Sequence, residues 1–367
     1  MYNNENKTLK FNEDGKFKIL MFSDLHSHGN FHGIGRAFYR NKMLNAMNAL
    51  LDEVKPDFVM VGGDLCVGSF HNDSMSREEN MALTLKDMEE VLEPVISRNI
   101  PWAHVFGNHD AEAMFTKEEQ ENLLEKLPNC LSQAGPKELY GVGNYVLPVY
   151  SYKNEGKIGY NIFCLDSNRE LKDELKLFGV EGKDDNAILP FPFGMGKCQS
   201  MPLFSQVMWY FNKSVEIEYK EGRKVPAIIC MHNPILEYNL IYRNPEETDM
   251  KGSKRESPAC SELNSGLFFA CLERGDVKGI FCGHEHLNTY QGTYCGITMA
   301  YDGCIGFDMS AHDDLRGGRI IELDENEGKF ETKFIALVDL MGKKAWRNEE
   351  AFEGGWHTEY FIRNTHL

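Results

Sequence analysis

Short apolar runs alternate with stretches of helical periodicity through most of the chain. Val, Ile, Phe and Met fill the runs, and each run ends at a polar or glycine-rich step. This order of elements is typical of a sheet covered by helices. Strands are predicted at 17–22, 57–61, 102–106, 160–165 and 225–231.

The segments between these runs carry apolar residues at three- and four-residue spacing, as expected of helices with one buried face. Such helices are predicted over 43–54 and 204–215. Ser76 and Thr116 each precede a glutamate by three positions, which is the spacing of a capping box at the start of a helix. The first part of the chain therefore contains both strands and helices in alternation.

The later part is richer in strands, which are predicted at 277–282, 289–300, 319–323 and 330–338. No internal repeat or Ser- or Pro-rich linker divides the chain. We therefore expect a single domain over residues 1–340. Residues 341–367 carry several aromatic side chains and are expected to form a C-terminal extension packed on that domain.

Two stretches resist a regular assignment. Residues 172–202 are rich in Gly, Pro, Phe and Met, and residues 236–261 are polar with mixed charge. Loops of this length in a compact domain are usually functional lids or disordered. We expect them to form walls around a substrate.

The composition is that of an ordinary folded protein. Hydrophobic residues make up 42% of the 367 residues and charged residues 26%. The formal net charge of -17 would repel a phosphate backbone over most of the surface, so nucleic acid is excluded as a general partner. A metal site could still attract an anionic substrate, because a bound divalent ion dominates its local field.

Membrane insertion and secretion are not expected. No run approaches the roughly 20 apolar residues that span a bilayer. The polar N-terminal segment has no apolar core of a signal peptide. The ten cysteines form no CxxC pair and are best explained as free thiols in a reducing compartment. A cytoplasmic location is therefore expected.

Five polar clusters share one feature, which is that each stands where a predicted strand ends. The carboxyl edges of strands are where sites assemble in sheets flanked by helices, so the clusters can meet in space. They are Asp24-Leu25-His26, Gly63-Asp64, Gly107-Asn108-His109-Asp110, His232-Asn233-Pro234 and Gly283-His284-Glu285-His286.

Each cluster alone is weak evidence of function. An Asp-x-His is common by chance, Gly-Asp is often a turn, and a single His at a strand end is more often structural than a ligand. The ordered set of clusters favours a site. Its imidazole, carboxylate and amide donors suit Zn, Fe or Mn and suit Ca poorly.

On these motifs, which read D-x-H, G-D, G-N-H-[DE], H and G-H-x-H, the chain resembles the calcineurin-like metallophosphoesterase superfamily. The resemblance extends from residue 18 to about residue 288. Softer matches at 164–167 and 318–323 resemble the intracellular branch related to purple acid phosphatases. The expected fold is α/β, a four-layer α-β-β-α sandwich of two mixed sheets flanked by helices.

The resemblance implies two divalent or trivalent metal ions (Mn, Fe or Zn) held by two sets of ligands that share one carboxylate. Asp24, His26 and His286 would hold one ion, Asn108, His232 and His284 the other, and Asp64 would bridge them. No Tyr follows Asp64 within four positions, so the purple colour of a ferric phenolate is not expected.

His109 would face the leaving oxygen of an ester, and Asp110 would orient it. Two cations neutralise a phosphoryl group and turn a bridging water into hydroxide, the nucleophile, while an imidazolium at His109 protonates the leaving alkoxide for about 10²–10⁴-fold in rate. The alternative is that His109 only buttresses Asn108. Among nearby cations, Arg169 is a candidate to grip phosphate, although an ordinary surface role is the default.

The function expected from this set is hydrolysis of a phosphomonoester, with a small phosphorylated molecule or a phosphoprotein as substrate. Two alternatives remain, a phosphodiesterase acting on cyclic nucleotides or similar esters, and a non-catalytic scaffold that keeps the fold. The motifs leave the substrate, the metals and the oligomeric state open, because metal ions contact only the phosphoryl group.

Overall fold

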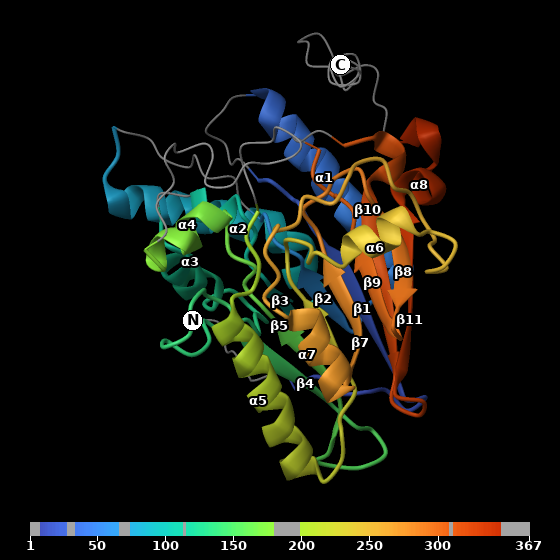
Figure 1. The fold of residues 1–367 in the computed structure, drawn as a ribbon. Coiled ribbons are helices and arrows are strands. Elements are labelled where there is room, and N and C mark those ends of the chain that lie inside the picture. Colours follow the sequence, from blue (N-terminus) through green and yellow to red (C-terminus); the bar gives the residue numbers. More distant parts are fainter. Residues whose placement is uncertain are drawn as a thin grey trace.

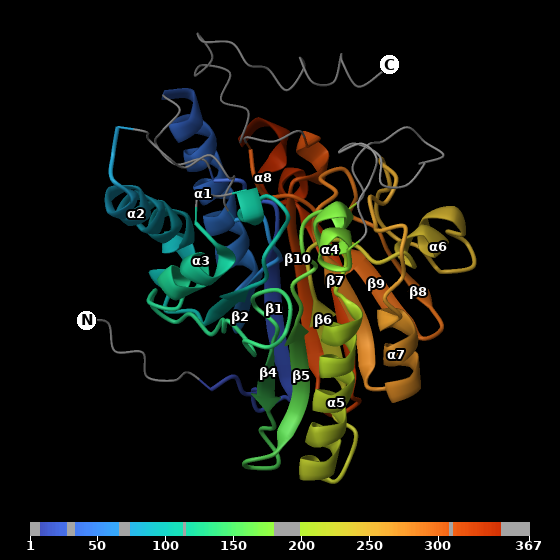
Figure 2. The same cartoon turned by 60° about the vertical axis from the view of Figure 1, so that its left-hand side comes forward.

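The computed structural model describes residues 8–27, 34–65, 74–112, 115–179, 199–307 and 311–345. Most of the predicted wall segment 172–202 and nearly all of the predicted C-terminal extension 341–367 lie outside these residues. The same holds for His28 and His32 in the loop after the first cluster. Figures 1 and 2 show two sheets stacked face to face with helices on their outer sides.

The first sheet is mixed and has the strand order β11-β10-β1-β2-β3. β1, β2 and β3 run parallel, whereas β10 is antiparallel to both β1 and β11. Its strands are β1 (Lys16–Phe22), β2 (Phe58–Val61), β3 (Trp102–His104), β10 (Gly317–Asp324) and β11 (Lys329–Ala336).

The second sheet is also mixed, with the order β4-β5-β6-β7-β9-β8. β5, β6, β7 and β9 are parallel, and β4 and β8 are antiparallel edge strands. Its strands are β4 (Tyr145–Tyr150), β5 (Ile158–Cys164), β6 (Ala227–Cys230), β7 (Val277–Cys282), β8 (Gln291–Tyr294) and β9 (Ile297–Tyr301).

The helices divide between the two outer faces. α1, α2 and α3 lie beside the first sheet, with α8 near α1, and α5 and α7 lie beside the second sheet (Figure 2). Their bounds are α1 (Ile34–Val54), α2 (Arg77–Ile96), α3 (Lys117–Leu124), α4 (Leu171–Leu177), α5 (Phe204–Glu221), α6 (Tyr238–Arg243), α7 (Leu267–Arg274) and α8 (Leu337–Ala345).

Successive residues of the central strands belong to different cores, which gives the molecule its four layers. In β1, Ile19 packs between the two sheets while Leu20 packs under α1 and α2. In β6, Ile228 packs between the sheets while Ile229 packs under α5 and α7. A strand that is buried on both faces has a continuous run of apolar residues. For this reason the positions of these strands could be predicted from the sequence. The predicted four-layer sandwich is confirmed.

The capping boxes predicted at Ser76 and Thr116 are present. The single strand predicted at 289–300 is wrong, because β8 and β9 form a hairpin there. Cys295 and Gly296 turn the chain with φ of 50° and 80°, values that suit a tight hairpin turn. The stretch 236–261 contains α6 and is not one irregular loop. Among the described residues, no helix is both long and apolar enough to cross a membrane.

Candidate metal centre

The ends of strands from both sheets meet at one edge of the molecule. β1, β2 and β3 deliver the first three polar clusters from the first sheet, and β6 and β7 deliver the last two from the second. Parallel strands point their carboxyl ends the same way, so residues far apart in sequence converge here. The structure brings together all of the predicted metal ligands, which are Asp24, His26, Asp64, Asn108, His232, His284 and His286.

Asp24, His26 and His286 form one tight group. The Asp24 Oδ1 atom lies 3.2 Å from His286 Nε2 and 3.6 Å from His26 Nε2. The two imidazole Nε2 atoms are 3.1 Å apart. All three donor atoms therefore point at a common centre, and their spacing is small enough for one metal ion to be held between them.

A second group adjoins the first. The Asp64 Oδ2 atom lies 3.2 Å from His232 Nε2 and 3.6 Å from His26 Nε2, so it stands between donors of the two predicted sets. Asn108 Oδ1 lies 2.9 Å from His284 Nδ1, and the rings of His284 and His232 are 5.4 Å apart at their centroids. Asp24 Oδ1 also lies 3.8 Å from His232 Nε2, so both carboxylates stand near donors of the two sets. The bridging role of Asp64 stays a prediction.

The backbone at the site is held in an uncommon conformation. Asp24, His26, Asp64 and His284 have positive φ values of 54°, 47°, 50° and 77°. Such values are sparsely populated by residues with a side chain and cluster at functional sites. Hydrogen bonds hold the turns, since the Asp24 Oδ2 atom accepts both the Ser23 hydroxyl at 2.8 Å and the His284 backbone N–H at 3.0 Å.

Two motif glycines are required because carboxylates pack against them. A Cβ atom at Gly107 would overlap the Asp64 carboxylate, and one at Gly283 would overlap Ser23 and crowd Asp24. The glycines in the third and fifth clusters thus allow the ligand side chains to approach the neighbouring backbone closely.

The charges of the site depend on one another. Burial opposes ionisation of Asp24 and Asp64, yet the nearby imidazoles outweigh it and lower the pKa of both carboxyls. Burial likewise opposes a charge on His232, but the two carboxylates raise its pKa. Burial lowers the pKa of His284 to about 3. Without a bound ion, the site thus favours ionised carboxylates and a charged His232, so a metal ion that binds there must displace the proton of that imidazole.

Unsatisfied buried atoms indicate that the site fits a cation. Several buried side-chain atoms of the described residues have no hydrogen-bond partner, and at this site they include Asp24 Oδ1, His26 Nδ1 and His232 Nε2. Leaving such atoms unpaired is costly unless an ion or water satisfies them. Imidazole nitrogens with carboxylate and amide oxygens, and no thiolate, suit Mn, Fe or Zn.

His109 lies beside the predicted metal ligands, with its ring centroid 5.2 Å from that of His26. Its backbone N–H donates to Asp64 Oδ1 at 2.8 Å. The resemblance gives Asp110 the task of orienting the His109 ring, and this role stays a prediction. Asp110 Oδ2 accepts the backbone N–H groups of Asp64 and Gly107 at 2.9 and 2.8 Å, which joins the two loops.

The side chain that contacts the His109 ring is Glu112, whose Oε2 atom lies 2.9 Å from His109 Nδ1. Glu112 lies outside the five motifs and was not predicted as a site residue. The signal was its spacing, because residues three apart in a 3₁₀ turn lie over one another and this segment forms such a turn, η2 (Asp110–Glu112). Arg169 contacts the other oxygen, Glu112 Oε1, at 3.3 Å.

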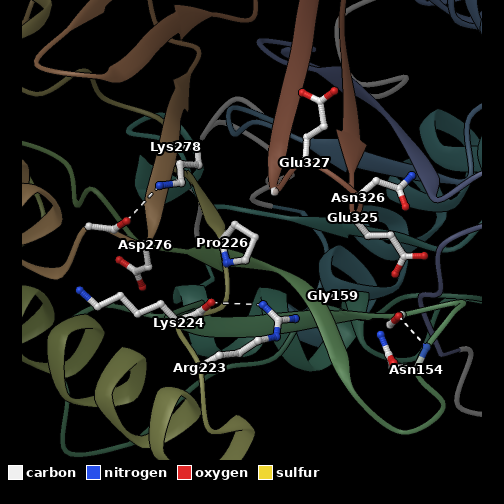
Figure 3. Close-up of a pocket in the computed structure, with 13 residues that line it drawn as sticks. Asn154, Gly159, Arg223, Lys224, Pro226, Asp276, Lys278, Glu325, Asn326 and Glu327 are labelled. Carbon is white, nitrogen blue, oxygen red and sulfur yellow. Dashed lines mark hydrogen bonds between the residues drawn. The ribbon is translucent and has the colours of Figure 1, made fainter.

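A separate cavity of about 450 Å³ lies at the other end of the sheets (Figure 3). Its lining comes from the amino ends of β6 and β7 and from the turn between β10 and β11, and includes Arg223, Lys278 and Glu325. Arg223 donates to the backbone oxygen of Ile158 at 2.6 Å, and Lys278 to that of Gly275 at 3.0 Å. None of the predicted metal ligands lines this cavity.

Two stacked mixed sheets with carboxylate and imidazole donors at their strand ends are the arrangement of a metallophosphoesterase. The chain matches the calcineurin-like phosphoesterase family over residues 17–288 and belongs to that family.

Similar proteins agree with this assignment. The chain is 30% identical to "Probable inactive purple acid phosphatase 14" of Arabidopsis thaliana, over 82% of this chain and 73% of that protein. It is 27% identical to "Phosphatase DCR2" of Saccharomyces cerevisiae, over 77% of this chain and 46% of the yeast protein. A solved dimetal phosphatase from Danio rerio shares the fold, with a TM-score of 0.52, 14% identity and coverage of 86% and 98% of the two chains.

Proposed function

We propose that this protein hydrolyses phosphomonoesters with a pair of metal ions and with His109 as the general acid. The observation that carries the proposal is the convergence of the whole predicted ligand set on one buried cluster. A family member that had lost catalysis would be free to lose these donors. Their retention supports an active enzyme, although the name of an Arabidopsis relative contains the word "inactive".

In this proposal, seven residues would bind the two metal ions and His109 would donate the proton. Asp24, His26 and His286 would hold one ion, Asn108, His232 and His284 the other, and Asp64 would lie between them. When bound, the ions supply the positive charge that draws in the phosphoryl group and activates water for attack. His109 lies beside this cluster, where its imidazole can donate a proton to the leaving oxygen.

The backbone and side chain of His109 have different contacts, which makes the acid role testable. The backbone N–H holds Asp64 and survives any substitution of the side chain. His109→Ala should therefore keep wild-type metal content while losing about 10²–10⁴-fold in kcat on an alkyl phosphate, whose leaving group is a strong base. An unchanged rate would exclude His109 as the acid.

The assay begins with protein loaded with Mn, Fe or Zn, with metal content measured on the same sample. Hydrolysis of a mono-aryl phosphate is then compared with that of a bis-aryl phosphate. Faster turnover of the monoester supports the proposal, and preference for the diester would favour a phosphodiesterase. A fully loaded protein that hydrolyses neither ester would refute the proposed function and support a scaffold. A panel of phosphorylated small molecules and phosphopeptides then defines the substrate class.

A further inference from the structure

A chain of three polar side chains extends from His109 away from the predicted metal ligands. His109 Nδ1 faces Glu112 Oε2 at 2.9 Å, and the other carboxylate oxygen of Glu112 faces Arg169 Nη2 at 3.3 Å. A carboxylate can only accept hydrogen bonds, so His109 Nδ1 is the donor. The opposite ring nitrogen, Nε2, is therefore left for the substrate.

The two ends of this chain come from different sheets. His109 and Glu112 follow β3 of the first sheet, and the backbone bond from Glu112 N–H to His109 oxygen at 3.0 Å fixes the turn that stacks their side chains. Arg169 follows β5 of the second sheet. Glu112 thus connects the general acid to the opposite side of the site.

The backbone that carries Arg169 is firmly anchored. Asn168 has a φ of 62°, and its side-chain amide donates to Met201 oxygen at 2.9 Å and to Gln206 Oε1 at 3.1 Å. Its backbone N–H donates to the buried Asp166 carboxylate at 2.9 Å, which also binds Lys117 at 2.8 Å. These hydrogen bonds therefore fix the position of the backbone from which the Arg169 side chain extends.

His109 needs such support because it is not enclosed. Its side chain and that of Glu112 are each 31% exposed. A partly exposed imidazole without a partner would exchange between rotamers and between its two neutral tautomers. Catalysis by proton donation requires the donor nitrogen to stay within hydrogen-bond reach of the leaving oxygen.

We propose that Glu112, held by Arg169, is a positioning residue that accepts the Nδ1–H of His109 and so keeps the ring in one rotamer, in which the Nε2–H of the imidazolium, the proton to be donated, faces the leaving oxygen. The inference rests on the proposed function. It differs from the simple phosphate-gripping role considered for Arg169 in the sequence, because the guanidinium reaches the reacting atoms only through Glu112 and His109.

The test compares an alkyl phosphate with 2,4-dinitrophenyl phosphate, whose leaving group is a weak base that departs without a proton. Glu112→Ala should lose about 10- to 100-fold in kcat on the alkyl ester, the usual cost of removing an orienting partner, and little on the dinitrophenyl ester. Glu112→Gln keeps an acceptor at the same reach and should fall between wild type and Glu112→Ala. Glu118→Ala, a change on the exposed side of α3, is the matched control and should behave as wild type on both esters.

A second measurement does not depend on activity. In metal-free protein, the imidazole ¹⁵N signals of His109, assigned by their loss in His109→Asn, should show a proton on Nδ1. In Glu112→Ala they should move toward the Nε2–H tautomer. Arg169→Met should reproduce the leaving-group pattern with a smaller loss.

Four outcomes would overturn the inference. Equal losses on both esters in Glu112→Ala would mean a general structural role, and wild-type rates on both would mean no role. An unchanged ¹⁵N pattern would mean that Glu112 does not hold the Nδ1–H. Wild-type protein that carries two metal equivalents and hydrolyses neither ester would refute the proposed function itself, and the inference with it.

Discussion

Gly107→Ala tests whether the Asp64 carboxylate is a metal ligand, and it does so without substituting any of the predicted ligand residues. The new Cβ would overlap Asp64 Oδ1 and lie 2.5 Å from the Asp64 backbone nitrogen. Gly107 is not among the residues with positive φ, so alanine suits its backbone and the effect is steric alone. The substitution therefore acts by displacing Asp64.

The size of the displacement follows from the contact. Cβ atoms essentially never approach other heavy atoms closer than 3.0 Å, so a contact of 2.5 Å must open by about half an ångström or more. Metal–ligand distances tolerate only about 0.2 Å. Overpacking of this kind costs about 1–3 kcal/mol of folding stability. The protein should therefore stay folded and lose its metal.

Two quantities are measured. They are the metal content after loading and desalting, and the free energy of unfolding of the metal-free protein in urea. Gly156→Ala is the control, because Gly156 has a φ of 75° and nothing within 4 Å of its would-be Cβ. Its backbone strain should cost about 1–2 kcal/mol and leave the metals in place. Retention of two metal equivalents by Gly107→Ala at wild-type affinity would refute the assignment of Asp64 as a ligand.

Three further predictions concern the site and its supports. Asp64→Ala should bind neither ion, and elemental analysis that finds two equivalents would contradict a bridging role. His104→Ala should cost about 1–3 kcal/mol in urea unfolding, because it removes the buried contact of 2.7 Å between His104 Nδ1 and the Ser132 hydroxyl. Burial raises the pKa of Glu174 from 4.5 to about 7. The folded state therefore keeps a proton that the unfolded chain releases, and stability falls as pH rises between these values. Glu174→Gln should raise the thermal midpoint at pH 8 but not at pH 4, and equal effects at both would contradict this.

The central strands and the convergence of the carboxylates and imidazoles were predictable because both follow from strong local signals. Strands such as β7 are buried on both faces and read as apolar runs, and the polar residues directly after them mark the carboxyl edge. Asp24, Asp64 and His232 could be placed from that logic alone. Their contacts confirm that these strand ends converge.

The edge elements were harder to predict. β4 was missed because Pro148 interrupts its pattern, and proline is tolerated only at an edge such as this one. The β8–β9 hairpin was missed because Cys295-Gly296 lacks the usual Asn-Gly or Asp-Gly signal. In both cases the strand is stabilised by its pairing within the sheet, and the local sequence alone does not indicate that pairing.

Glu112 shows a different limit of the sequence. The motif stops at Asp110, and the three-residue spacing between His109 and Glu112 indicates a contact only when the local backbone conformation is known. That contact depends on the chain forming a 3₁₀ turn, which stacks positions three apart, and on Arg169 arriving from the other sheet. The contact between Arg169 and Glu112 joins residues far apart in the sequence, and such contacts produce no periodic pattern.

The site joins the two sheets, since Asp24 and Asp64 come from the first and His232, His284 and His286 from the second. The apolar layer between the sheets therefore sets the distance between the two halves of the ligand set. Phe281 packs in that layer, and two residues later Gly283 opens the turn that carries His284. Because packed cores are dense and transmit strain, the spacing of the metal ligands is a property of the sheet packing as much as of the ligands themselves.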